Sequence, residues 1–438
     1  MRKIHLGLLG YGTVGTGVVK ILLENKDLIV SRVGAELVLK HVADIDVRRD
    51  RGIQLSAGVL VTDAQKVVDD PDIDIVIEMI GGTGIAKELV LRAIGKGKQL
   101  VTANKALLAI HGNSIFKAAA EKGVELAYEA SVGGCIPIIK SLRESLVANH
   151  VTSMTGILNG TCNYILSQIS DEKSTFETAL SEAQQNGIAE ADPTLDVEGI
   201  DTAHKLAILT ALSNGMEINF KDIYIEGISK ITPLDIEFAA QFGYRIKLLA
   251  IGKNRNNSIE ARVHPTMIPF NHLLSNINGT LNAIALTGDA VGDILLCGHG
   301  AGMMPTASAV VGDIVDLARN LLCGGGRRVP LLSYQMENLR NLPILPIDDI
   351  FTHYYLRFSA LDRPLVLSRI SGILGNHHIS IKSVQQKGRK TNGTVPLVML
   401  THRAKEADVK NALAEINCLD VVGDHPVLIR IEDENNQD

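Results

Sequence analysis

The chain has 438 residues, a length typical of two or three domains. A hydrophobic content of 46% with 21% charged residues indicates an ordinary globular protein with a large core, and a net charge of −6 argues against nucleic-acid binding. Five cysteines lie far apart without a CxxC motif, which predicts reduced thiols rather than a disulfide framework or a zinc site. Because no signal peptide and no membrane-spanning apolar run is recognisable, we expect a cytoplasmic protein without a membrane partner.

The first 130 residues alternate between strand and helix patterns. This alternation predicts parallel strands joined by crossover helices, so residues 1–130 should form a doubly wound sheet of the Rossmann, NAD(P)-binding type within an α/β protein. The expected strands are Ile4–Leu9, Glu36–Ala43, Ile73–Ile80, Gln99–Thr102 and Val124–Glu129, and the expected helices run from the first strand to Leu23 and over Ile85–Gly95 and Ala106–Lys122.

Residues 131–322 show a mixed pattern that predicts an α+β domain with its own sheet, used for substrate binding and dimerisation. The expected helices are Thr175–Asn186, Ile200–Leu212, Leu234–Leu249 and Thr306–Leu322, the last of which should pack back on the first domain. The expected strands are Val151–Ile157, Ile223–Ile228, Ile259–Val263 and Asn282–Ala290.

The C-terminal part is predicted to be a separate small domain. Residues 323–350, which are rich in glycine and then in proline, are interpreted as a linker. Residues 351–432 read as strand, helix, strand, strand, helix, strand, the ferredoxin-like split βαβ layout. A sheet of this kind often pairs with a second copy of itself.

A glycine-rich loop follows the first strand and opens the first helix. It reads Gly10-Tyr11-Gly12-Thr13-Val14-Gly15, the GxGxxG pattern. Gly10 permits the tight turn, and Gly12 lets the backbone approach a pyrophosphate that the helix N-terminus stabilises. This context favours dinucleotide binding over a plain glycine turn.

The end of the second strand bears on the coenzyme. Asp44 could accept a hydrogen bond from a ribose 2′-hydroxyl, which favours NAD, whereas Arg48 or Arg49 could hold the 2′-phosphate of NADP. Solvated arginines are the alternative. We interpret the pattern as slightly favouring NADP, with either coenzyme usable.

An acidic block precedes a single lysine in an otherwise apolar helix. Asp201 and Lys205 are four residues apart, and the residues after Lys205 are apolar almost all round, which predicts a buried helix. A buried lysine beside carboxylates can exchange protons near neutral pH, so we expect this segment to hold the residues that carry out the chemistry. The alternative is an exposed ion pair. The acids of the block are Glu190, Asp192, Asp196, Glu198 and Asp201.

Three further segments have two readings each. Lys105 follows a buried strand at the sheet edge where ligands bind, so it is either a solvated lysine or a cation that meets cofactor and substrate. Glu129 and the glycine-rich bend after it could hold a monovalent cation or form a hinge without metal. The glycine loop at 298–304 could contact the nicotinamide side of a cofactor or simply join two domains, and we assign His299 no catalytic role.

Taken together, these motifs resemble homoserine dehydrogenase with a C-terminal ACT domain, over essentially the whole chain. The matching motifs are GYGTVG, TANKALLA, EASVGGCIPII, GILNGTCNYIL, GIAEADPTLDVEGIDTAHK, GAGMMPTASAVVGDI and DRPLVLSRISGILGNHHISIKSV. The resemblance implies reversible reduction of L-aspartate 4-semialdehyde to L-homoserine with NADPH or NADH, a step towards threonine and methionine.

The resemblance also implies residue roles. Lys205 would be the general acid/base and Lys105 the second active-site lysine, with Asp201 beside them. Glu190 and Asp201 would bind homoserine, with Asp196 nearby. Glu129 and the carbonyls of Val132, Gly134 and Ile136 would bind sodium, and the cofactor would contact Tyr11, Thr13, Val14, Gly187 and Gly302.

Two departures from the family pattern affect these expectations. His299 stands where the family often has proline, so cofactor contact there should differ. Leu365 replaces the usual glycine of DRPG, which puts in question whether the ACT domain binds threonine, the implied effector. We expect a homodimer or homotetramer. The alternatives are another NAD(P)-dependent semialdehyde dehydrogenase, which needs a cysteine nucleophile, and a non-catalytic amino-acid sensor.

Overall fold

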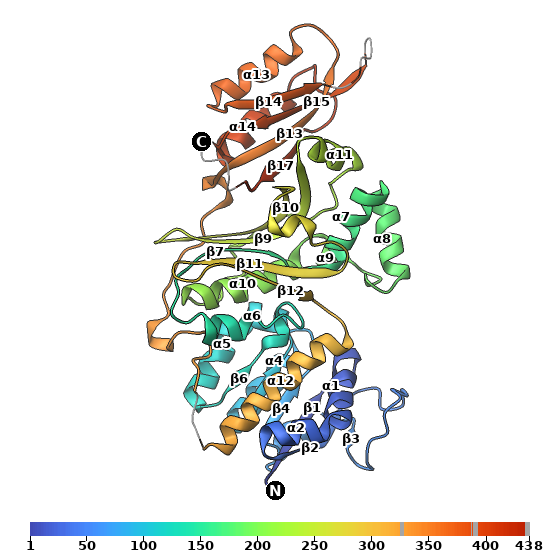
Figure 1. Cartoon of the computed structure of the whole chain (residues 1–438), viewed down its shortest axis with the longest axis vertical. Helices are drawn as coiled ribbons and strands as arrows, with labels where there is room; N and C mark the ends of the chain where they lie inside the picture. Colours follow the sequence, from blue (N-terminus) through green and yellow to red (C-terminus); the bar gives the residue numbers. More distant parts are fainter. Residues whose placement is uncertain (325–327, 387, 389–392, 434–438) are drawn as a thin grey trace.

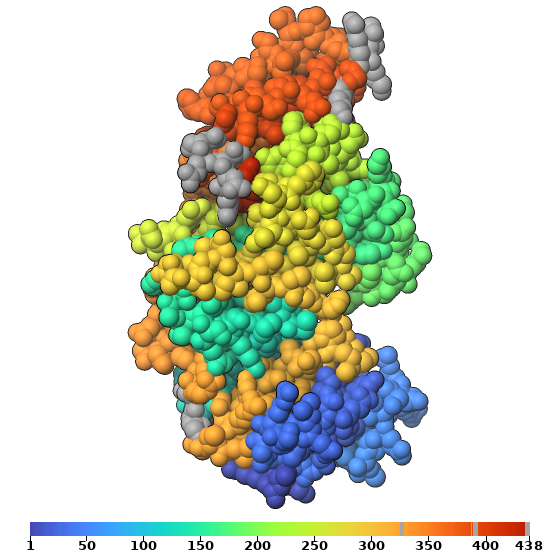
Figure 2. Space-filling model, viewed as in Figure 1, coloured from blue at the N-terminus to red at the C-terminus, as the bar shows by residue number. Residues whose placement is uncertain are grey.

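The structure, a computed structural model, describes residues 1–324, 328–386, 388 and 393–433. The molecule is elongated, with the N-terminal unit at one end, a large sheet across the middle and the C-terminal unit at the other end (Figures 1 and 2). Residues 325–327 of the predicted linker and the polar tail at 434–438 lie outside the described residues. No helix in the described ranges has both the length and the hydropathy required to cross a lipid bilayer.

The N-terminal unit contains a six-stranded parallel sheet in the order β3-β2-β1-β4-β5-β6, so the predicted doubly wound sheet is confirmed. Its strands β1, β4 and β5 are almost completely buried because helices cover both faces. The strands are β1 (Lys3–Leu9), β2 (Glu36–Ala43), β3 (Leu60–Val61), β4 (Ile75–Glu78), β5 (Gln99–Thr102) and β6 (Leu126–Ala127). The helices are α1 (Thr13–Glu24), α2 (Lys26–Val33), α3 (Gln65–Asp69), α4 (Ile85–Gly95) and α5 (Lys105–Lys122).

Helix α12 (Met303–Leu322) comes late in the chain but packs against α1 of the N-terminal unit (Figure 1). Gly17 makes this close approach possible, since a Cβ atom there would lie 2.9 Å from the Cβ of Ala307. The chain therefore returns to the N-terminal unit directly after the glycine loop at residues 298–302.

The middle of the molecule is built on an eleven-stranded sheet with the main order β12-β11-β7-β9-β10-β17-β13-β15-β14. Its first part consists of β7 (Val151–Ile157), β8 (Tyr224–Ile225), β9 (Tyr244–Asn254), β10 (Ile259–Pro269), β11 (Leu281–Gly288) and β12 (Gly292–His299). The helices of this part are α6 (Ile138–Lys140), α7 (Gly160–Glu172), α8 (Phe176–Gln185), α9 (Thr194–Val197), α10 (Ile200–Asn214) and α11 (Pro233–Gln241). Helix α10 lies between α5 on one side and strands β9 and β10 on the other, and so joins the two units.

The helix predicted over Leu234–Leu249 is wrong in its second half. Helix α11 ends at Gln241, Gly243 has a left-handed φ of +85°, and β9 begins at Tyr244. The apolar run after Tyr244 is buried as a central strand, and a short continuous apolar run does not distinguish a buried strand from a buried helix. The sequence reading also did not identify α7 and β12.

The C-terminal unit has the predicted ferredoxin-like layout, but its sheet is continuous with the central one. It comprises β13 (Phe351–Leu361), α13 (Val366–Asn376), β14 (Ile381–Gln386), β15 (Thr394–Thr401), the short β16 (Ala404–Lys405), α14 (Glu406–Asn417) and β17 (Val427–Ile431). Strand β17 pairs in parallel with β10, with Arg430 opposite Thr266. One edge of the C-terminal sheet is thus occupied within the same chain, which leaves β14 at the other edge.

Candidate active site

A cavity of about 570 Å³ lies where the N-terminal unit meets the central sheet. It is bounded by the start of α5, the N-terminus of α7, the acidic block, helix α10 and the segment that enters α12. Of the residues selected from the sequence, those that line it are Val14, Lys105, Gly134, Gly187, Glu190, Asp196, Asp201, Lys205 and Gly302. The acid/base, substrate and nicotinamide-side candidates therefore converge on one cavity.

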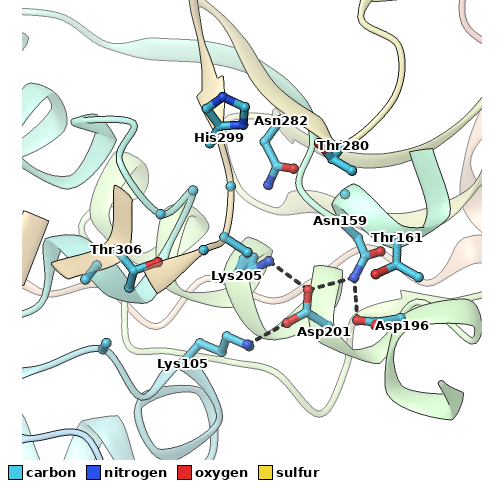
Figure 3. A pocket seen from close by; sticks show the side chains of 18 of the residues that line it. Lys105, Asn159, Thr161, Asp196, Asp201, Lys205, Thr280, Asn282, His299 and Thr306 are labelled. Atoms are coloured by element: carbon cyan, nitrogen blue, oxygen red, sulfur yellow. Dashed lines mark hydrogen bonds and ion pairs between the residues drawn. The ribbon is translucent and has the colours of Figure 1, made fainter. Parts of the chain in front are cut away.

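Helix α10 carries the two central side chains. Every residue from Asp201 to Asn214 is buried, as the apolar pattern predicts. The Lys205 Nζ donates to an Asp201 carboxylate oxygen at 2.7 Å (Figure 3). It also donates to the Leu158 carbonyl at 2.6 Å. Asp201 and Lys205 are 6% and 7% exposed, so this pair is not a surface ion pair.

Asp201 is shared between two ammonium groups. The Lys105 Nζ, at the first residue of α5, lies 3.0 Å from the other Asp201 oxygen (Figure 3). The Lys105 side chain is 41% exposed, compared with 9% for that of Lys205. Both lysines thus reach the cavity, one from the N-terminal unit and one from the buried helix α10.

The charges in this cluster shift one another's pKa values. Burial lowers the pKa of Lys205, and the Asp201 carboxylate offsets part of that effect. Burial alone would raise the pKa of Asp201, but the ammonium groups of Lys205 and Lys105 hold it below its ordinary value. The pKa of Lys105 is raised, chiefly by Asp201. The buried lysine is therefore the amine that gives up its proton more easily.

An asparagine not identified from the sequence connects the acids. Asn159 caps the N-terminus of α7 by accepting from the Cys162 amide, and its Nδ2 donates to Asp196 at 2.7 Å and to Asp201 at 2.9 Å. Both carboxylates are held in place by this one amide (Figure 3).

The remaining acids differ in their position. Glu190 is exposed and lines the cavity, whereas Asp192 lies outside the cavity lining and accepts hydrogen bonds from the amide and the hydroxyl of Thr194. Glu190, Asp196 and Asp201 therefore form a negatively charged wall that suits an ammonium group of a ligand.

The first glycine loop has the geometry that phosphate binding needs. Gly10 has a φ of +94°, and a Cβ there would lie 2.6 Å from the backbone of Met79 in the chain after β4. At Gly12 a Cβ would meet nothing within 4 Å, which leaves open space beside the start of α1. A Cβ on Gly15 would lie 2.2 Å from the Gly10 carbonyl oxygen, so close backbone contacts require glycine at Gly10 and Gly15, whereas Gly12 faces open space.

Asp44 is already partnered, and the arginine that meets it is Arg51. The Tyr11 amide donates to Asp44 at 2.6 Å, and the Arg51 guanidinium lies 3.3 Å from Asp44 and 4.6 Å from the centre of the Tyr11 ring. Arg48 and Arg49 are exposed. The sequence pattern pointed to Arg48 and Arg49, whereas the arginine that contacts Asp44 is Arg51, two residues further along the chain.

The bend after Glu129 lies beside the cavity. The Glu129 carboxylate accepts from the backbone amides of Ile139 and Lys140 at 2.8 and 2.7 Å. Burial and then the neighbouring Asp313 carboxylate raise the pKa of Glu129 to about 7. Gly134 has a φ of +57°, and a Cβ there would lie 2.6 Å from the backbone of Gly300. Glu129, Val132 and Ile136 do not line the cavity itself.

Several lining residues were not selected from the sequence: Ser131, Asn159, Thr161, Thr280, Asn282 and Thr306. The motifs that carry the family resemblance contain Ser131, Asn159, Thr161 and Thr306, whereas Thr280 and Asn282 lie outside those motifs. His299 also lines the cavity and is exposed. Among the described residues that line the cavity there is no cysteine, and Cys162 behind it is fully buried, with a pKa raised by burial.

Comparison with protein families gives three matches in chain order. A family model described as "Homoserine dehydrogenase, NAD binding domain" matches residues 10–129, "Homoserine dehydrogenase" matches 137–315, and "ACT domain" matches 354–418. The sequence is similar to the homoserine dehydrogenases of Neisseria gonorrhoeae (46% identity over 432 residues, 99% of each chain) and Pseudomonas aeruginosa (46% over 437 residues, 99% of this chain and 100% of the relative).

Solved structures give the same result. The crystal structure of a homoserine dehydrogenase from Thiobacillus denitrificans matches with a TM-score of 0.94 and 48% identity, covering 99% of both chains. A structure of homoserine dehydrogenase from S. aureus matches with a TM-score of 0.77 and 32% identity, again over 99% of both chains. With full-length relatives this similar and a cavity that gathers the expected side chains, the chain belongs to the homoserine dehydrogenase family, NAD(P)-dependent oxidoreductases that act on a CH–OH group.

Proposed function

We propose that this protein reduces L-aspartate 4-semialdehyde reversibly to L-homoserine, with Lys205 as the general acid/base. The observation that carries the proposal is a buried Lys205 amine that reaches the cavity while it is held by Asp201 and the Leu158 carbonyl. When bound, the nicotinamide coenzyme supplies the hydride for the aldehyde carbon. The oxygen then gains negative charge, which the Lys205 ammonium stabilises before it donates a proton.

The other side chains position the two lysines and bind the substrate. Asp201 keeps the two ammonium groups at the reacting end of the cavity, because its two oxygens are paired with Lys205 and Lys105. Glu190 and Asp196, on the acidic wall, bind the α-ammonium group of the substrate. In the reverse reaction, homoserine oxidation, the neutral Lys205 amine acts as general base and accepts the hydroxyl proton. A pKa below that of a free lysine favours this role, because more of the amine is deprotonated near neutral pH.

The decisive assay follows oxidation of NADPH and NADH with aspartate semialdehyde, with and without threonine. Turnover with this aldehyde supports the proposal, whereas coenzyme binding without turnover would support the amino-acid sensor. Reduction of NADP⁺ by the aldehyde that depends on Cys135 would instead favour an aldehyde dehydrogenase, in which a thiohemiacetal loses hydride to form a thioester, but Cys135 does not line the cavity.

We propose that the protein uses NADPH in preference to NADH and accepts both coenzymes. The support is that the Arg51 guanidinium balances the Asp44 carboxylate, which removes the repulsion that an unpaired acid would exert on a 2′-phosphate. Replacing Arg48 and Arg49 together with alanine should raise the KM for NADPH more than that for NADH. Equal effects on both coenzymes would discard the phosphate role of these two arginines.

A sodium ion beside Glu129 remains part of the proposal. The residues fit a monovalent cation, because Glu129 and Asp313 are both buried and burial raises both pKa values even though the Lys140 ammonium lies 3.3 Å from Asp313. Two consecutive glycines in left-handed conformation turn the backbone of the bend, and oxygen ligands suit such an ion. Glu129 and the carbonyls of Val132, Gly134 and Ile136 would hold it.

We propose threonine as the effector of the C-terminal unit, with Leu365 as the residue that weakens its binding. Leu365 has a φ of +73°, in the left-handed region that favours glycine, and its side chain is 75% exposed just before α13. The glycine usual in the family would relieve this backbone strain and open the surface beside the helix. Restoring it with Leu365→Gly should therefore strengthen any threonine inhibition seen in the assay.

We also propose a homodimer or homotetramer. The support is that β12 and β14 are the two end strands of the eleven-stranded sheet, with exposed apolar side chains at Leu295 and Val384. Sedimentation equilibrium of the full chain tests this, and a monomer at micromolar concentration would refute it.

A further inference from the structure

A second cavity, of about 180 Å³, lies between helices α7 and α11 and the first half of strand β9. Figure 1 shows α7 and α11 next to each other at the central sheet, and the loop at 270–278 forms the remaining wall. None of the described residues that line this cavity lines the catalytic one. At about 30 Å³ for each water molecule, the volume holds roughly six waters or one small organic molecule.

Two basic side chains of β9 line this cavity. Lys247 is 2% exposed, and its Nζ donates to the Ile277 carbonyl at 2.6 Å. It also donates to the side-chain oxygens of Asn163 and Asn278, at 2.9 Å each, so its three acceptors are all neutral. Arg245, two residues earlier and therefore on the same face of the strand, donates from Nη1 to Asn278 at 3.3 Å. Most of the five N–H donors of this guanidinium remain available.

Neither cation has a carboxylate partner. Within the described part of the chain, neither Lys247 nor Arg245 forms an ion pair with an acid, whereas Lys253 on the same strand meets Glu432 at 2.5 Å. Buried charges are normally paired, so the cavity carries positive charge that no neighbour neutralises. In agreement, burial and then the charge of Arg245 lower the pKa of Lys247 to about 7.

The rest of the lining limits what the cavity can hold. Asp171, an exposed residue on α7, is the one acid among the described lining residues, and its charge acts against a multiply charged anion. The lining residues contributed by α11 and by the loop at 270–278 are uncharged. The lining therefore suits one negative charge on a short apolar chain. Its apolar members include Leu166, Ile236, Ala240 and Phe270.

We propose that this cavity binds the carboxylate of a small organic acid, with Arg245 donating to the carboxylate oxygens and Lys247 supplying a second positive charge. The inference does not rest on the proposed function. It adds a second ligand site at the C-terminal half of α7, a helix whose N-terminus borders the catalytic cavity. Two sources share this chemistry: a plain monocarboxylic acid, and an α-amino acid whose ammonium group would pair with Asp171.

The test is calorimetric titration of the full chain with isovalerate, a short branched monocarboxylate. Lys247→Met and Arg245→Gln should each weaken its binding about 10-fold or more, because each removes a charged partner of the carboxylate. The matched control is Lys253→Met, which removes a lysine of the same strand that is already paired and should leave the affinity unchanged. Thermal unfolding checks each variant. If Lys247→Met does not fold, the less buried Arg245→Gln decides the question.

The pH gives a second measurement. A bound carboxylate favours the charged form of Lys247, so the pKa of this amine should rise on binding and a proton should be taken up. The affinity for isovalerate should therefore fall as the pH rises above about 7. The heat of binding should also differ between two amine buffers of different ionisation enthalpy. Lys247→Met should abolish both effects, because Arg245 keeps its charge.

Titration with L-valine separates the two sources. Tighter binding of L-valine than of isovalerate, with the advantage lost in Asp171→Asn, would identify the ligand as an amino acid. Tighter binding of isovalerate would identify it as a plain organic acid.

Four results would overturn the site. The first is the absence of saturable heat when either probe is titrated into the wild-type protein. The second is equal isovalerate affinity in the wild type and in the folded Lys247 and Arg245 variants. The third is an equal loss of affinity in Lys205→Met, which would place the probe in the catalytic cavity. The fourth is tighter binding of inorganic phosphate, lost in the same variants, which would show that the ligand is not a carboxylate.

Discussion

Two regions of this molecule bury charge, and they do so in different ways. In the cavity, Asp201 has two ammonium groups for one carboxylate, and the Lys105 side chain remains two-fifths exposed. Asn282 next to them has no partner in the described chain. This cluster therefore retains hydrogen-bonding capacity that faces an open volume of about 570 Å³.

The second region is the seam, by which we mean the paired strands β10 and β17 with Glu260, Arg262, Glu406, Arg430 and Glu432. Arg430 donates two hydrogen bonds to Glu406, at 2.9 and 2.5 Å, and a third to Glu226 at 2.8 Å. Arg262 is paired with Glu260 at 2.6 Å and also with Glu432. Both arginines are 2% exposed.

The difference shows that burial of charge does not by itself identify an active site. In the seam each arginine meets its carboxylates with several hydrogen bonds, which is what a buried ion pair needs in order not to destabilise the fold. In the cavity, the Lys105 side chain is partly exposed and the Asn282 amide has no partner in the described part of the chain, so hydrogen-bonding capacity remains for a ligand. Polar groups that lack a hydrogen-bond partner beside a cavity, rather than buried charges as such, identify a binding site.

The largest expected effect comes from Lys205→Met. It should lower kcat about 10²- to 10⁴-fold, the usual contribution of a general acid/base, while Asp201 keeps its pairing with Lys105 and the fold survives. Steady-state kinetics measures the loss, and NADPH binding by fluorescence should be unchanged. The matched control is Lys253→Met on β9, beside the seam, which removes a lysine 2.5 Å from Glu432 and should leave kcat as it is. Near-normal turnover of Lys205→Met would remove this lysine from the chemistry.

The next effect is on stability. Arg430→Met leaves Glu406, which is fully buried, without its main partner and should lower the free energy of unfolding by about 3–5 kcal/mol. Urea unfolding followed by circular dichroism measures this. The double variant Arg430→Met with Glu406→Leu should recover much of the loss, because it removes the unpaired charge. A loss below about 1 kcal/mol in the single variant would mean that water reaches the seam.

Sequence reasoning located the cofactor-binding unit well because its signals are local. The strands Glu36–Ala43 and Gln99–Thr102 and the helix Ile85–Gly95 were predicted to the residue. The seam could not be predicted, since the pairing of β10 with β17 joins residues about 160 positions apart and leaves no periodic pattern. The failure at β9 has the same origin, because only the tertiary environment distinguishes a buried strand from a buried helix there.

At the site, sequence reasoning selected charged residues and overlooked amides. Lys105, Lys205 and Asp201 attract notice because charge inside an apolar pattern is unusual. Asn159 and Asn282 are ordinary in sequence and acquire their meaning only when folding brings α7 and β11 to the same cavity.

The third effect is a pH-dependent contribution of Glu432 in the seam to the free energy of unfolding. Lys253 and Arg262 hold the pKa of Glu432 below its ordinary value, although burial alone would raise it. A lowered folded-state pKa stabilises the fold above the unfolded value, near 4.3, and this stabilisation is lost as the pH falls through the folded value. Glu432→Gln should therefore cost about 2 kcal/mol at pH 7 and progressively less below pH ~4.3, as measured by urea unfolding across pH. A cost that does not vary with pH would contradict this assignment, and Glu36→Gln, in an exposed pair with Lys26, is the surface control.

The smallest effect is a shift of the pH–rate profile caused by Asp201→Asn. In homoserine oxidation Lys205 must be deprotonated, so kcat should rise with pH through the pKa of this amine, which burial places below that of free lysine. The Asp201 carboxylate raises that pKa, and its removal should move the rising limb to lower pH, even though the maximal rate also falls. Asp196→Asn, which removes a carboxylate with a weaker influence on Lys205, should move the limb less and in the same direction. A limb that stays in place or moves to higher pH would show that the titrating group is not an amine beside Asp201, since loss of a nearby negative charge lowers the pKa of such an amine. The chemistry of the cavity would then depend on a residue other than Lys205.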